Sequence, residues 1–382
     1  MVPRSASVTI QELARGYPVI AVTGPRQSGK TTLVRATFPD HPYVSLENPA
    51  QREFAETDPA GFLGQFPEGA VLDEAQRCPS LFEWLQGIVD ESRQPGRFVL
   101  TGSQQFGLLS GITQSLAGRV ALVRLLPFSG RELRAAKLQP DVLEQAVFRG
   151  GYPPIYDRDL DPGIWFANYV QTYLERDVRQ LVNVRNLAQF QRFLRLCAGR
   201  TGQLLNLSGL GDEAGVSHNT AREWISVLEA SFVVHRLPPH HRNFNRRLVK
   251  TPKLYFLDSG LAAWLLGIEQ ADQLVTHPLR GPLFETWVVA EFLKHRFNEG
   301  KPSNLSFWRD RAGHEIDLLV EGASGIQPVE IKATATPTSD AAAGVRRWQT
   351  IAAADAARPA LIYDGSTTKH RSTIDLVSWR DV

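Results

Sequence analysis

The stretch Gly24-Pro-Arg-Gln-Ser-Gly-Lys-Thr-Thr32 decides the fold of the N-terminal part of this 382-residue chain. It fits the pattern G-x-x-x-x-G-K-[ST], and it lies between the apolar run Val19-Ile-Ala-Val-Thr23 and a helix-forming run, as the pattern requires. The glycines let backbone N–H groups curl around the β- and γ-phosphates of a nucleotide at a helix N-terminus. Lys30 supplies a positive charge for the γ-phosphate, and the Thr31 hydroxyl can ligate Mg²⁺. The predicted nucleotide-binding residues are Gly24, Pro25, Arg26, Gln27, Ser28, Gly29, Lys30, Thr31 and Thr32.

A second motif, Ala70-Val-Leu-Asp-Glu-Ala-Gln76, ends another apolar run in acidic residues. Asp73 is placed to hold the water shell of Mg²⁺, and Glu74 beside it can orient and deprotonate an attacking water. We expect the strand-like run 42–46 to lie between the two motif strands, as in ATPases with an additional strand and a catalytic glutamate. A GTPase fits less well, because the sequence has no Asn-Lys-x-Asp motif.

Two more polar positions lie beside strand-like runs. Ser103 and Gln104 follow the run 98–101, and either could sense the γ-phosphate, with a helix N-cap as the alternative role of Ser103. Arg119 precedes the run 120–125 and could neutralise transition-state charge, in cis or across a subunit interface, or form a structural ion pair instead. The predicted catalytic residues are Lys30, Glu74, Ser103 and Arg119.

Apolar runs and chain breakers divide the chain into three parts. Strand-like runs alternate with helix-like segments in the first part, which predicts a parallel α/β sheet covered by helices. These strand-like runs are residues 18–23, 42–46, 70–72, 98–101 and 120–125, and the helix-like segments include 29–38 and 80–91. The breakers Gly150-Gly-Tyr-Pro-Pro154 end this part.

The second part is helical from residue 165, with a first helix expected over 165–184, and ends in strand-like runs at 232–237 and 253–257. The third reads as helix 282–298, strands 305–309, 315–321 and 328–332, helix 340–354 and strand 360–363. We therefore predict domains at residues 1–150, 151–258 and 259–382.

The composition excludes several classes of protein. With 43% apolar and 21% charged residues the chain is typical of globular proteins. No run approaches the roughly 18–20 apolar residues of a membrane span, and the first residues lack the apolar core of a signal peptide. Cys78 and Cys197 lie far apart and fit a reducing compartment. We expect a cytoplasmic protein with no membrane partner.

Residues 208–228 read as a helix, a tight turn and a second helix. Gly215 is placed to end the first helix and Ser217 to cap the second. One face of the second helix should be buried, and it contains Thr220, Ala221, Trp224, Ile225 and Leu228. The residues left outside are His218, Asn219, Arg222 and Glu223.

The next segment, His240-His-Arg-Asn-Phe-Asn-Arg-Arg247, would join two strands as a hairpin wing, so this region resembles a winged helix-turn-helix. In such folds the second helix enters the major groove, and basic wing residues bind phosphates. Residues 176–253 contain 13 Arg and Lys against 5 Asp and Glu, although the whole chain has a net charge of only +2. Such a local excess is typical of nucleic-acid partners, with docking to protein as the alternative. The predicted DNA-binding residues are His218, Asn219, Arg222, Arg242, Arg246 and Arg247, whereas His240 and His241 are expected on the wing surface rather than as metal ligands.

The C-terminal part contains a third group of polar residues. Asp317 lies in one strand-like run, and Glu330 and Lys332 share a face of the next, with Glu285 on the preceding helix as a fourth member. Two carboxylates can bind a divalent metal, and a lysine can orient the hydrolytic water. The element order and the D…ExK pattern resemble the PD-(D/E)XK nuclease core, although Ile316 stands where a proline usually precedes the aspartate. A structural ion pair, or a nuclease fold used only for binding, is the alternative. The predicted metal ligands are Thr31 and Asp73 at the nucleotide site, and Glu285, Asp317 and Glu330, with Lys332, at the nuclease-like site.

The motifs at 24–32, 72–76, 100–104 and 116–119 resemble those of the AAA+ type ATPase family of bacteria and archaea whose members carry a C-terminal domain of unknown function. Gly150-Gly-Tyr-Pro-Pro154 and Pro252-Lys-Leu-Tyr-Phe-Leu-Asp-Ser-Gly260 also resemble that family, so the likeness covers nearly the whole chain. It implies an α/β protein with an N-terminal P-loop NTPase sheet, a helical and winged-helix middle domain, and a C-terminal α/β restriction-endonuclease-like domain.

The expected function follows from these parts. We expect a Mg²⁺-dependent ATP hydrolase, with ATP and Mg²⁺ as cofactors, whose nucleotide cycle is coupled to a DNA-binding winged helix and a nuclease-like domain. A homo-oligomer is a further expectation, because Arg119 could act across a subunit interface. The alternatives are an ATP-regulated, metal-dependent DNA endonuclease, and a signalling or scaffold ATPase that binds protein rather than DNA.

Overall fold

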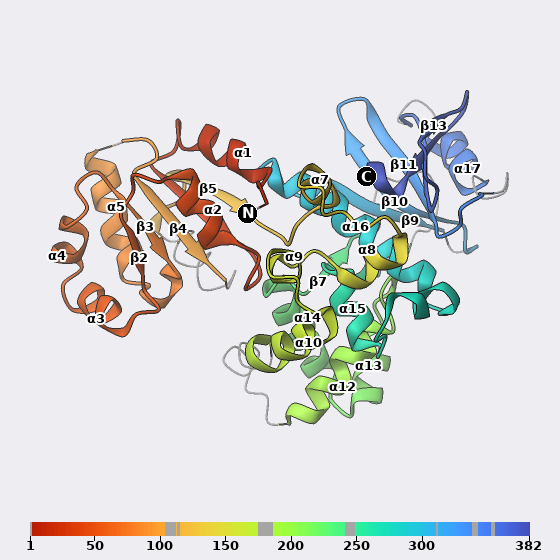
Figure 1. The fold of residues 1–382 in the computed structure, drawn as a ribbon, viewed down its shortest axis with the longest axis horizontal. Coiled ribbons are helices and arrows are strands. Elements are labelled where there is room, and N and C mark those ends of the chain that lie inside the picture. The colour runs from red at the N-terminus through yellow and green to blue at the C-terminus, as the bar shows by residue number, and fades with distance from the viewer. Residues whose placement is uncertain are drawn as a thin grey trace. The chain divides into compact units, whose positions relative to one another are not determined.

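A computed structural model describes residues 2–92, 94–103, 112, 115–174, 186–240, 249–310, 312–337, 343–352 and 356–382 (Figure 1). The chain forms two compact units. The first contains Met1–Phe128, Ala230–Phe232 and Lys294–Pro302, and the second contains Ser129–Glu229, Val233–Leu293 and Ser303–Val382. The predicted residues Gln104, His241, Arg242, Arg246 and Arg247 lie outside the described residues.

The first unit is built on a five-stranded sheet with the order β2-β3-β4-β1-β5, in which all neighbouring strands are parallel. Its strands are β1 (Val19–Thr23), β2 (Tyr43–Ser45), β3 (Ala70–Asp73), β4 (Phe98–Gly102) and β5 (Val120–Arg124). Its helices are α1 (Ala6–Leu13), α2 (Lys30–Thr37), α3 (Pro49–Thr57), α4 (Pro59–Gly64) and α5 (Leu81–Glu91), with the 3-10 turn η1 (Ala75–Arg77). The predicted parallel α/β sheet is therefore confirmed.

Helices cover both faces of this sheet. Alternate residues of a strand point to opposite faces, and β1 has both sets buried. Val19 and Ala21 belong to the apolar core that contains Phe62 of α4 and Phe82 of α5. The intervening residues of β1 belong to a second core, with Ile10 of α1 and with residues of α2.

The order of the strands corrects one expectation. The run 42–46 was predicted between the two motif strands, but β4 takes that place in the sheet and β2 lies at the edge. The burial of the two strands gives the physical reason. All five residues of β4 are buried, as in a central strand, whereas the three residues of β2 are only half-buried.

The second unit begins with helices and a small antiparallel sheet, ordered β6-β8-β7. Its strands are β6 (Gln203–Leu204), β7 (Val234–Leu237) and β8 (Lys253–Phe256). The helices of this region are α7 (Gly130–Ala135), α8 (Leu143–Arg149), α9 (Pro153–Asp157), α10 (Pro162–Tyr169), the π-helical η2 (Val170–Leu174), α12 (Leu187–Ala198), α13 (Leu207–Ala214), α14 (His218–Ala230), α15 (Ser259–Leu265) and the 3-10 turn η3 (Ala271–Thr276). The helix predicted from residue 165 begins earlier, at Pro162, because Asp161 caps it and the proline occupies its first turn.

The C-terminal residues form a six-stranded sheet with the order β13-β14-β12-β11-β10-β9. Its strands are β9 (Leu305–Arg309), β10 (Glu315–Gly322), β11 (Gly325–Lys332), β12 (Ala360–Tyr363), β13 (Lys369–His370) and β14 (Asp375–Ser378). The helices are α16 (Arg280–Asn298), α17 (Ala343–Ala352) and the 3-10 turn η6 (Trp379–Asp381). Strands β9, β10 and β11 are antiparallel, whereas β12 is parallel to both β11 and β14. The last two strands were not predicted, since they are short and only partly apolar.

Among the described residues, no helix combines the length and the apolar character needed to cross a membrane.

Candidate functional site

The loop between β1 and α2 curls around the side chain of Lys30. The ammonium nitrogen of Lys30 donates to the carbonyl oxygens of Gly24, at 3.0 Å, and Pro25, at 2.8 Å, and the side chain is buried. Gly29 precedes the helix at φ +90°, and a Cβ at Gly24 would lie 2.0 Å from the carbonyl oxygen of Leu125. Both positions therefore require glycine, and the loop presents its N–H groups at the start of α2.

The threonine after Lys30 meets the predicted metal carboxylate. Thr31 Oγ1 donates to Asp73 Oδ1 at 3.1 Å, and the hydroxyl of Thr101 on β4 donates to the same oxygen. Tyr43 at the start of β2 donates to Asp73 Oδ2 at 2.7 Å. Hydroxyl and carboxylate oxygens are the ligands that Mg²⁺ prefers, so Thr31 and Asp73 fit a magnesium ion.

Glu74 is held beside Asp73 in a special conformation. Its backbone has φ +55°, which is uncommon for a residue other than glycine and is often found at functional sites. Its Oε2 accepts hydrogen bonds from Ser103 Oγ at 2.9 Å and from Gln76 Nε2 at 2.6 Å. The structure therefore brings Lys30, Glu74 and Ser103 to the same edge of the sheet, with Thr31 and Asp73.

Arg119 lies elsewhere in the first unit. Its Nε and Nη2 donate to the two carboxylate oxygens of Asp90, on α5, at 2.6 and 2.8 Å. This two-point pair matches the structural role that the sequence left open. A role for Arg119 across a subunit interface stays a prediction.

Arg4 is a supporting residue that sequence reasoning missed. Its Nη1 donates to the carbonyl oxygen of Ser28 in the loop, at 2.7 Å, and its Nη2 to that of Leu126, at 2.6 Å. The guanidinium also lies 4.9 Å from the centre of the Phe128 ring. Arg4 thus connects the phosphate loop to the chain after β5, and no spacing pattern in the sequence indicates it.

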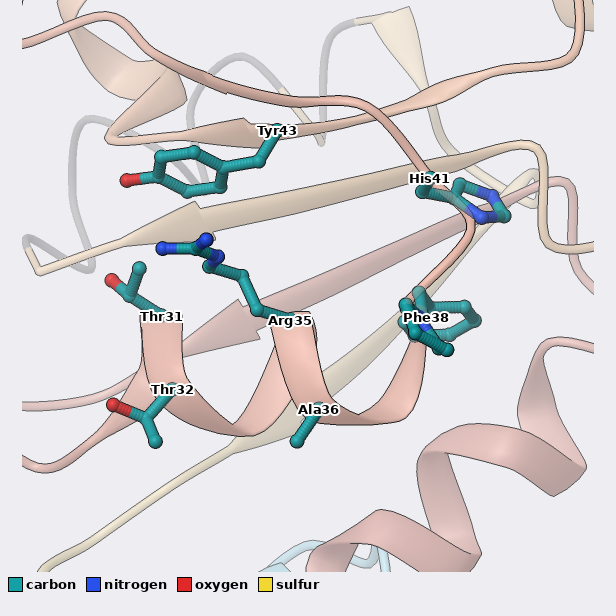
Figure 2. A pocket seen from close by; sticks show the side chains of 8 residues that line it. Thr31, Thr32, Arg35, Ala36, Phe38, His41 and Tyr43 are labelled. Atoms are coloured by element: carbon teal, nitrogen blue, oxygen red, sulfur yellow. The ribbon is translucent and has the colours of Figure 1, made fainter.

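A pocket of about 550 Å³ opens beside α2 and β2. Figure 2 shows the hydroxyl ends of Thr31 and Tyr43 and the guanidinium of Arg35 at one end of this pocket, with Phe38 and His41 at the other. The Arg35 guanidinium lies 4.8 Å from the centre of the Tyr43 ring. Burial and the hydrogen bond to Asp73 raise the pKa of Tyr43 to about 12, so its hydroxyl stays a donor at neutral pH.

The helix-turn-helix segment has the predicted burial pattern at Ala221, Trp224, Ile225 and Leu228, which are buried, whereas Thr220 is only half-buried because its hydroxyl lies beside that of Ser217. Gly215 ends α13 at φ +75°, and Ser217 Oγ accepts from the backbone N–H of Thr220 at 3.1 Å. His218, Asn219 and Arg222 are exposed on α14.

The expectation that His240 lies on a surface is wrong. It is buried, with its ring 5.6 Å from that of Trp348, because the apolar core of the C-terminal sheet accommodates it.

The two later motifs of the sequence contact each other within the second unit. Asp258 Oδ2 accepts from the backbone N–H of Gly151 at 2.8 Å, and its Oδ1 caps α15 through Leu261 N at 3.0 Å. A Cβ at Gly150 would lie 2.2 Å from the Asp258 carboxylate. The Gly-Gly-Tyr-Pro-Pro and Pro252–Gly260 motifs therefore have an architectural role at this contact.

The nuclease-like residues form two ion-paired groups. Lys332 Nζ lies 3.0 Å from Glu330 Oε2 and 3.4 Å from Asp317 Oδ2. Glu285 instead accepts from Lys253 Nζ at 3.0 Å.

Burial and the nearby charge of Asp317 raise the pKa of Glu330 to about 8 and that of Glu285 to about 7. Burial acts against the charged form of Asp317, but the ammonium groups of Lys332 and Lys253 hold its pKa below the usual value.

The three predicted carboxylate ligands are not assembled around a metal position. Within the described part of the chain, no three His, Cys, Asp or Glu side chains are grouped so that they could hold a metal ion. The physical reason is that lysine side chains occupy the space between these carboxylates. The residues of the nuclease-like site therefore do not fit the predicted metal set.

Comparisons with known proteins agree with the geometry of the first unit. Residues 16–134 match an AAA domain, so this part of the chain is an AAA-type P-loop ATPase domain. Residues 140–272 and 280–382 match two domains of unknown function, DUF8612 and DUF4143. The chain is 33% identical over 339 residues to the uncharacterized proteins Rv2008c of Mycobacterium tuberculosis and Mb2031c of Mycobacterium bovis, which covers 88% of this chain and 75% of each of theirs. It therefore belongs to the family of these proteins.

Two solved structures are similar over much of the chain. The Walker-type ATPase PABY2304 of Pyrococcus abyssi is 17% identical with a TM-score of 0.47, over 69% of this chain and 96% of that chain. The RuvB Holliday junction branch migration motor of Thermotoga maritima is 20% identical with a TM-score of 0.31, over 61% of this chain and 87% of that chain.

Proposed function

We propose that the protein is a Mg²⁺-dependent ATP hydrolase of the AAA+ type whose nucleotide cycle is coupled to a DNA-binding winged helix and a nuclease-like C-terminal domain. The observation that carries the proposal is the convergence of Lys30, the Thr31–Asp73 pair and the Glu74–Ser103 pair beside one phosphate loop. The match of residues 16–134 to an AAA domain supports it. Two unpaired, buried cysteines agree with action in the cytoplasm.

Each residue has a defined task in this proposal. The loop N–H groups and the Lys30 ammonium bind the β- and γ-phosphates, once Lys30 leaves the carbonyl oxygens that it now contacts. Thr31 and Asp73 would hold Mg²⁺, which neutralises phosphate charge when bound. Glu74 takes a proton from the attacking water, whose oxygen bonds to the γ-phosphorus as the bond from that phosphorus to the β-phosphate oxygen breaks. The products are ADP and inorganic phosphate, and Ser103 and Gln76 keep Glu74 oriented.

The assignment of Glu74 is tested by separating ATP binding from hydrolysis. We expect Glu74→Gln to lower phosphate release by about 10²-fold or more, because a positioned general base contributes about 10²–10⁴-fold. ATP affinity should stay within about twofold, since the phosphate-binding loop is unchanged. Glu91→Gln, at an exposed glutamate of α5, is the matched control. Hydrolysis by Glu74→Gln at the wild-type rate would contradict the assignment.

The proposal of DNA binding rests on the exposed face of α14. His218, Asn219 and Arg222 are exposed there, within a segment that has an excess of positive charge. Binding through phosphates should weaken steeply as salt increases, with a log–log slope that scales with the number of contacts. We expect Arg222→Ala to weaken binding of duplex DNA and lower that slope, unlike Arg131→Ala at an exposed position of α7. A partner that binds with little salt dependence would favour the scaffold alternative.

A further inference from the structure

The Pro252–Gly260 motif contains strand β8 of the small antiparallel sheet, and its side chains contact carboxylates in the C-terminal part of the same unit. Lys253 begins β8, where it pairs with Leu204 of β6 and Leu237 of β7. Its ammonium lies 3.0 Å from Glu285 Oε1 and also contacts the carboxylate of Glu315 on β10.

A second side chain of the motif binds the same helix. Tyr255 shares a face of β8 with Lys253, because residues i and i+2 of a strand point the same way. Its hydroxyl donates to Glu285 Oε1, the oxygen that Lys253 also contacts. The glutamate of α16 is therefore held by two donors from one strand of the small sheet.

The remaining carboxylates have cationic partners from the C-terminal sheet itself. Lys332 contacts Glu330 and Asp317, and Asp317 Oδ2 also accepts from the backbone N–H of Ile331 at 2.9 Å. Arg309 Nη1 lies 3.2 Å from Glu315 Oε2. We call this group the ion-pair cluster, and it consists of Lys253, Glu285, Arg309, Glu315, Asp317, Glu330 and Lys332.

Burial leaves little space around Lys253 and Glu330, at the inner side of the ion-pair cluster. Lys253 and Glu330 are 3% and 5% exposed. Oε1 of Glu330 lies so close to α17 that a Cβ at Gly344 would be 2.4 Å from it. An ammonium buried to this degree is stable only opposite carboxylates, and those carboxylates in turn need a cation.

We infer that Lys253, opposite Glu285 and Glu315, is a resident cation of the ion-pair cluster, and that together with Lys332, opposite Asp317 and Glu330, it replaces the divalent metal ion that the nuclease resemblance implies. Glu285 Oε1, Asp317 Oδ2 and Glu330 Oε2 already accept from side chains or backbone of the protein. The cluster thus joins β8 of the small sheet to α16 and β10, and it binds no metal. This inference concerns the second unit and does not depend on ATP hydrolysis in the first.

The test is Mn²⁺ binding to the full chain without nucleotide, measured by the electron paramagnetic resonance signal of free Mn²⁺. An Asp73→Asn background removes the carboxylate of the ATP site. We expect no Mn²⁺ binding at the ion-pair cluster of this parent. The same amount of Mn²⁺ should remain free after Asp317→Asn is added.

Removing the ammonium should open the cluster to a metal. We expect Lys253→Met in the same background to lower the melting temperature and to bind Mn²⁺ at least about tenfold more tightly than the detection limit that bounds the parent, because two carboxylates lose their cation. Adding Glu285→Gln should reverse part of both effects. Lys369→Met, at an exposed lysine of β13, is the control that should change neither.

Two results would overturn the inference. The first is Mn²⁺ binding by the parent that Asp317→Asn abolishes, or Mn²⁺-dependent DNA cleavage that Asp317→Ala abolishes. The second is a folded Lys253→Met variant with unchanged stability and unchanged Mn²⁺ affinity. If Lys253→Met does not fold, the comparison of the parent with Asp317→Asn still decides the question.

Discussion

Tyr43→Phe tests how the metal carboxylate of the ATP site is held. The change removes one hydroxyl, which donates to Asp73 Oδ2 at 2.7 Å, and keeps the ring that lies against Arg35. A hydrogen bond to a charged group contributes about 1.5–3 kcal/mol. Asp73 keeps its donors Thr31 and Thr101, and Tyr43 is only half-buried. We therefore expect the loss of this hydrogen bond to cost about 1–2 kcal/mol. This free energy corresponds to a factor of about 5–30 in an equilibrium constant.

The assay is steady-state phosphate release as a function of Mg²⁺ concentration, with ATP binding measured separately in the presence of a chelator. We expect the Mg²⁺ concentration for half-maximal rate to rise about 5–30-fold in Tyr43→Phe, while metal-free ATP affinity stays the same. Tyr17→Phe, at an exposed tyrosine of the same unit, should match the wild type. The same half-maximal Mg²⁺ concentration in Tyr43→Phe and wild type would refute the reasoning.

Three further variants test the orientation of Glu74, the contacts of Arg4 and the titration of Glu330. Ser103→Ala removes one of the two donors to Glu74, so kcat should fall about tenfold with KM nearly unchanged, and an unchanged kcat would exclude this role. Arg4→Met leaves two buried carbonyl oxygens without their charged donor, which should cost about 2–4 kcal/mol in urea unfolding; a loss below about 0.5 kcal/mol would contradict the contacts. Burial raises the pKa of Glu330 to about 8 in the folded protein, against about 4.3 when unfolded, so the folded state binds more protons and stability falls as pH rises between these values. In Glu330→Gln the free energy of unfolding should decrease less over this pH range. The same pH dependence in variant and wild type would contradict the raised pKa of Glu330.

Much of the first unit could be predicted from the sequence because its signals are local. The strands β1, β3, β4 and β5 are apolar runs that end in polar residues, and their predicted limits agree with the structure to within one residue. The phosphate loop and Asp73–Glu74 have fixed spacings that follow from phosphate and metal chemistry. The order of the strands in the sheet could not be predicted in the same way, because it depends on how the connections between the parallel strands pack against the sheet.

The supporting residues could not be predicted, because their partners are distant in sequence. Tyr43 and Arg4 belong to no motif, and their partners Asp73 and Ser28 lie 30 and 24 positions away in the sequence. Lys253 and Tyr255 lie in a motif that the sequence singled out, but their contacts with Glu285 bring together two separate elements of the fold. For the same reason the D…ExK pattern indicated a metal site without showing that Lys253 pairs with the neighbouring carboxylates of Glu285 and Glu315.

The central claim is that ATP is hydrolysed at the loop that surrounds Lys30. The most direct measurement is phosphate release from MgATP by the full chain, comparing wild type, Lys30→Ala and the exposed-lysine control Lys369→Ala. We expect turnover by wild type and control and a loss of about 10²-fold or more in Lys30→Ala, because the lysine binds the transferred phosphate. Hydrolysis by Lys30→Ala at the wild-type rate would show that ATP is not hydrolysed at this loop.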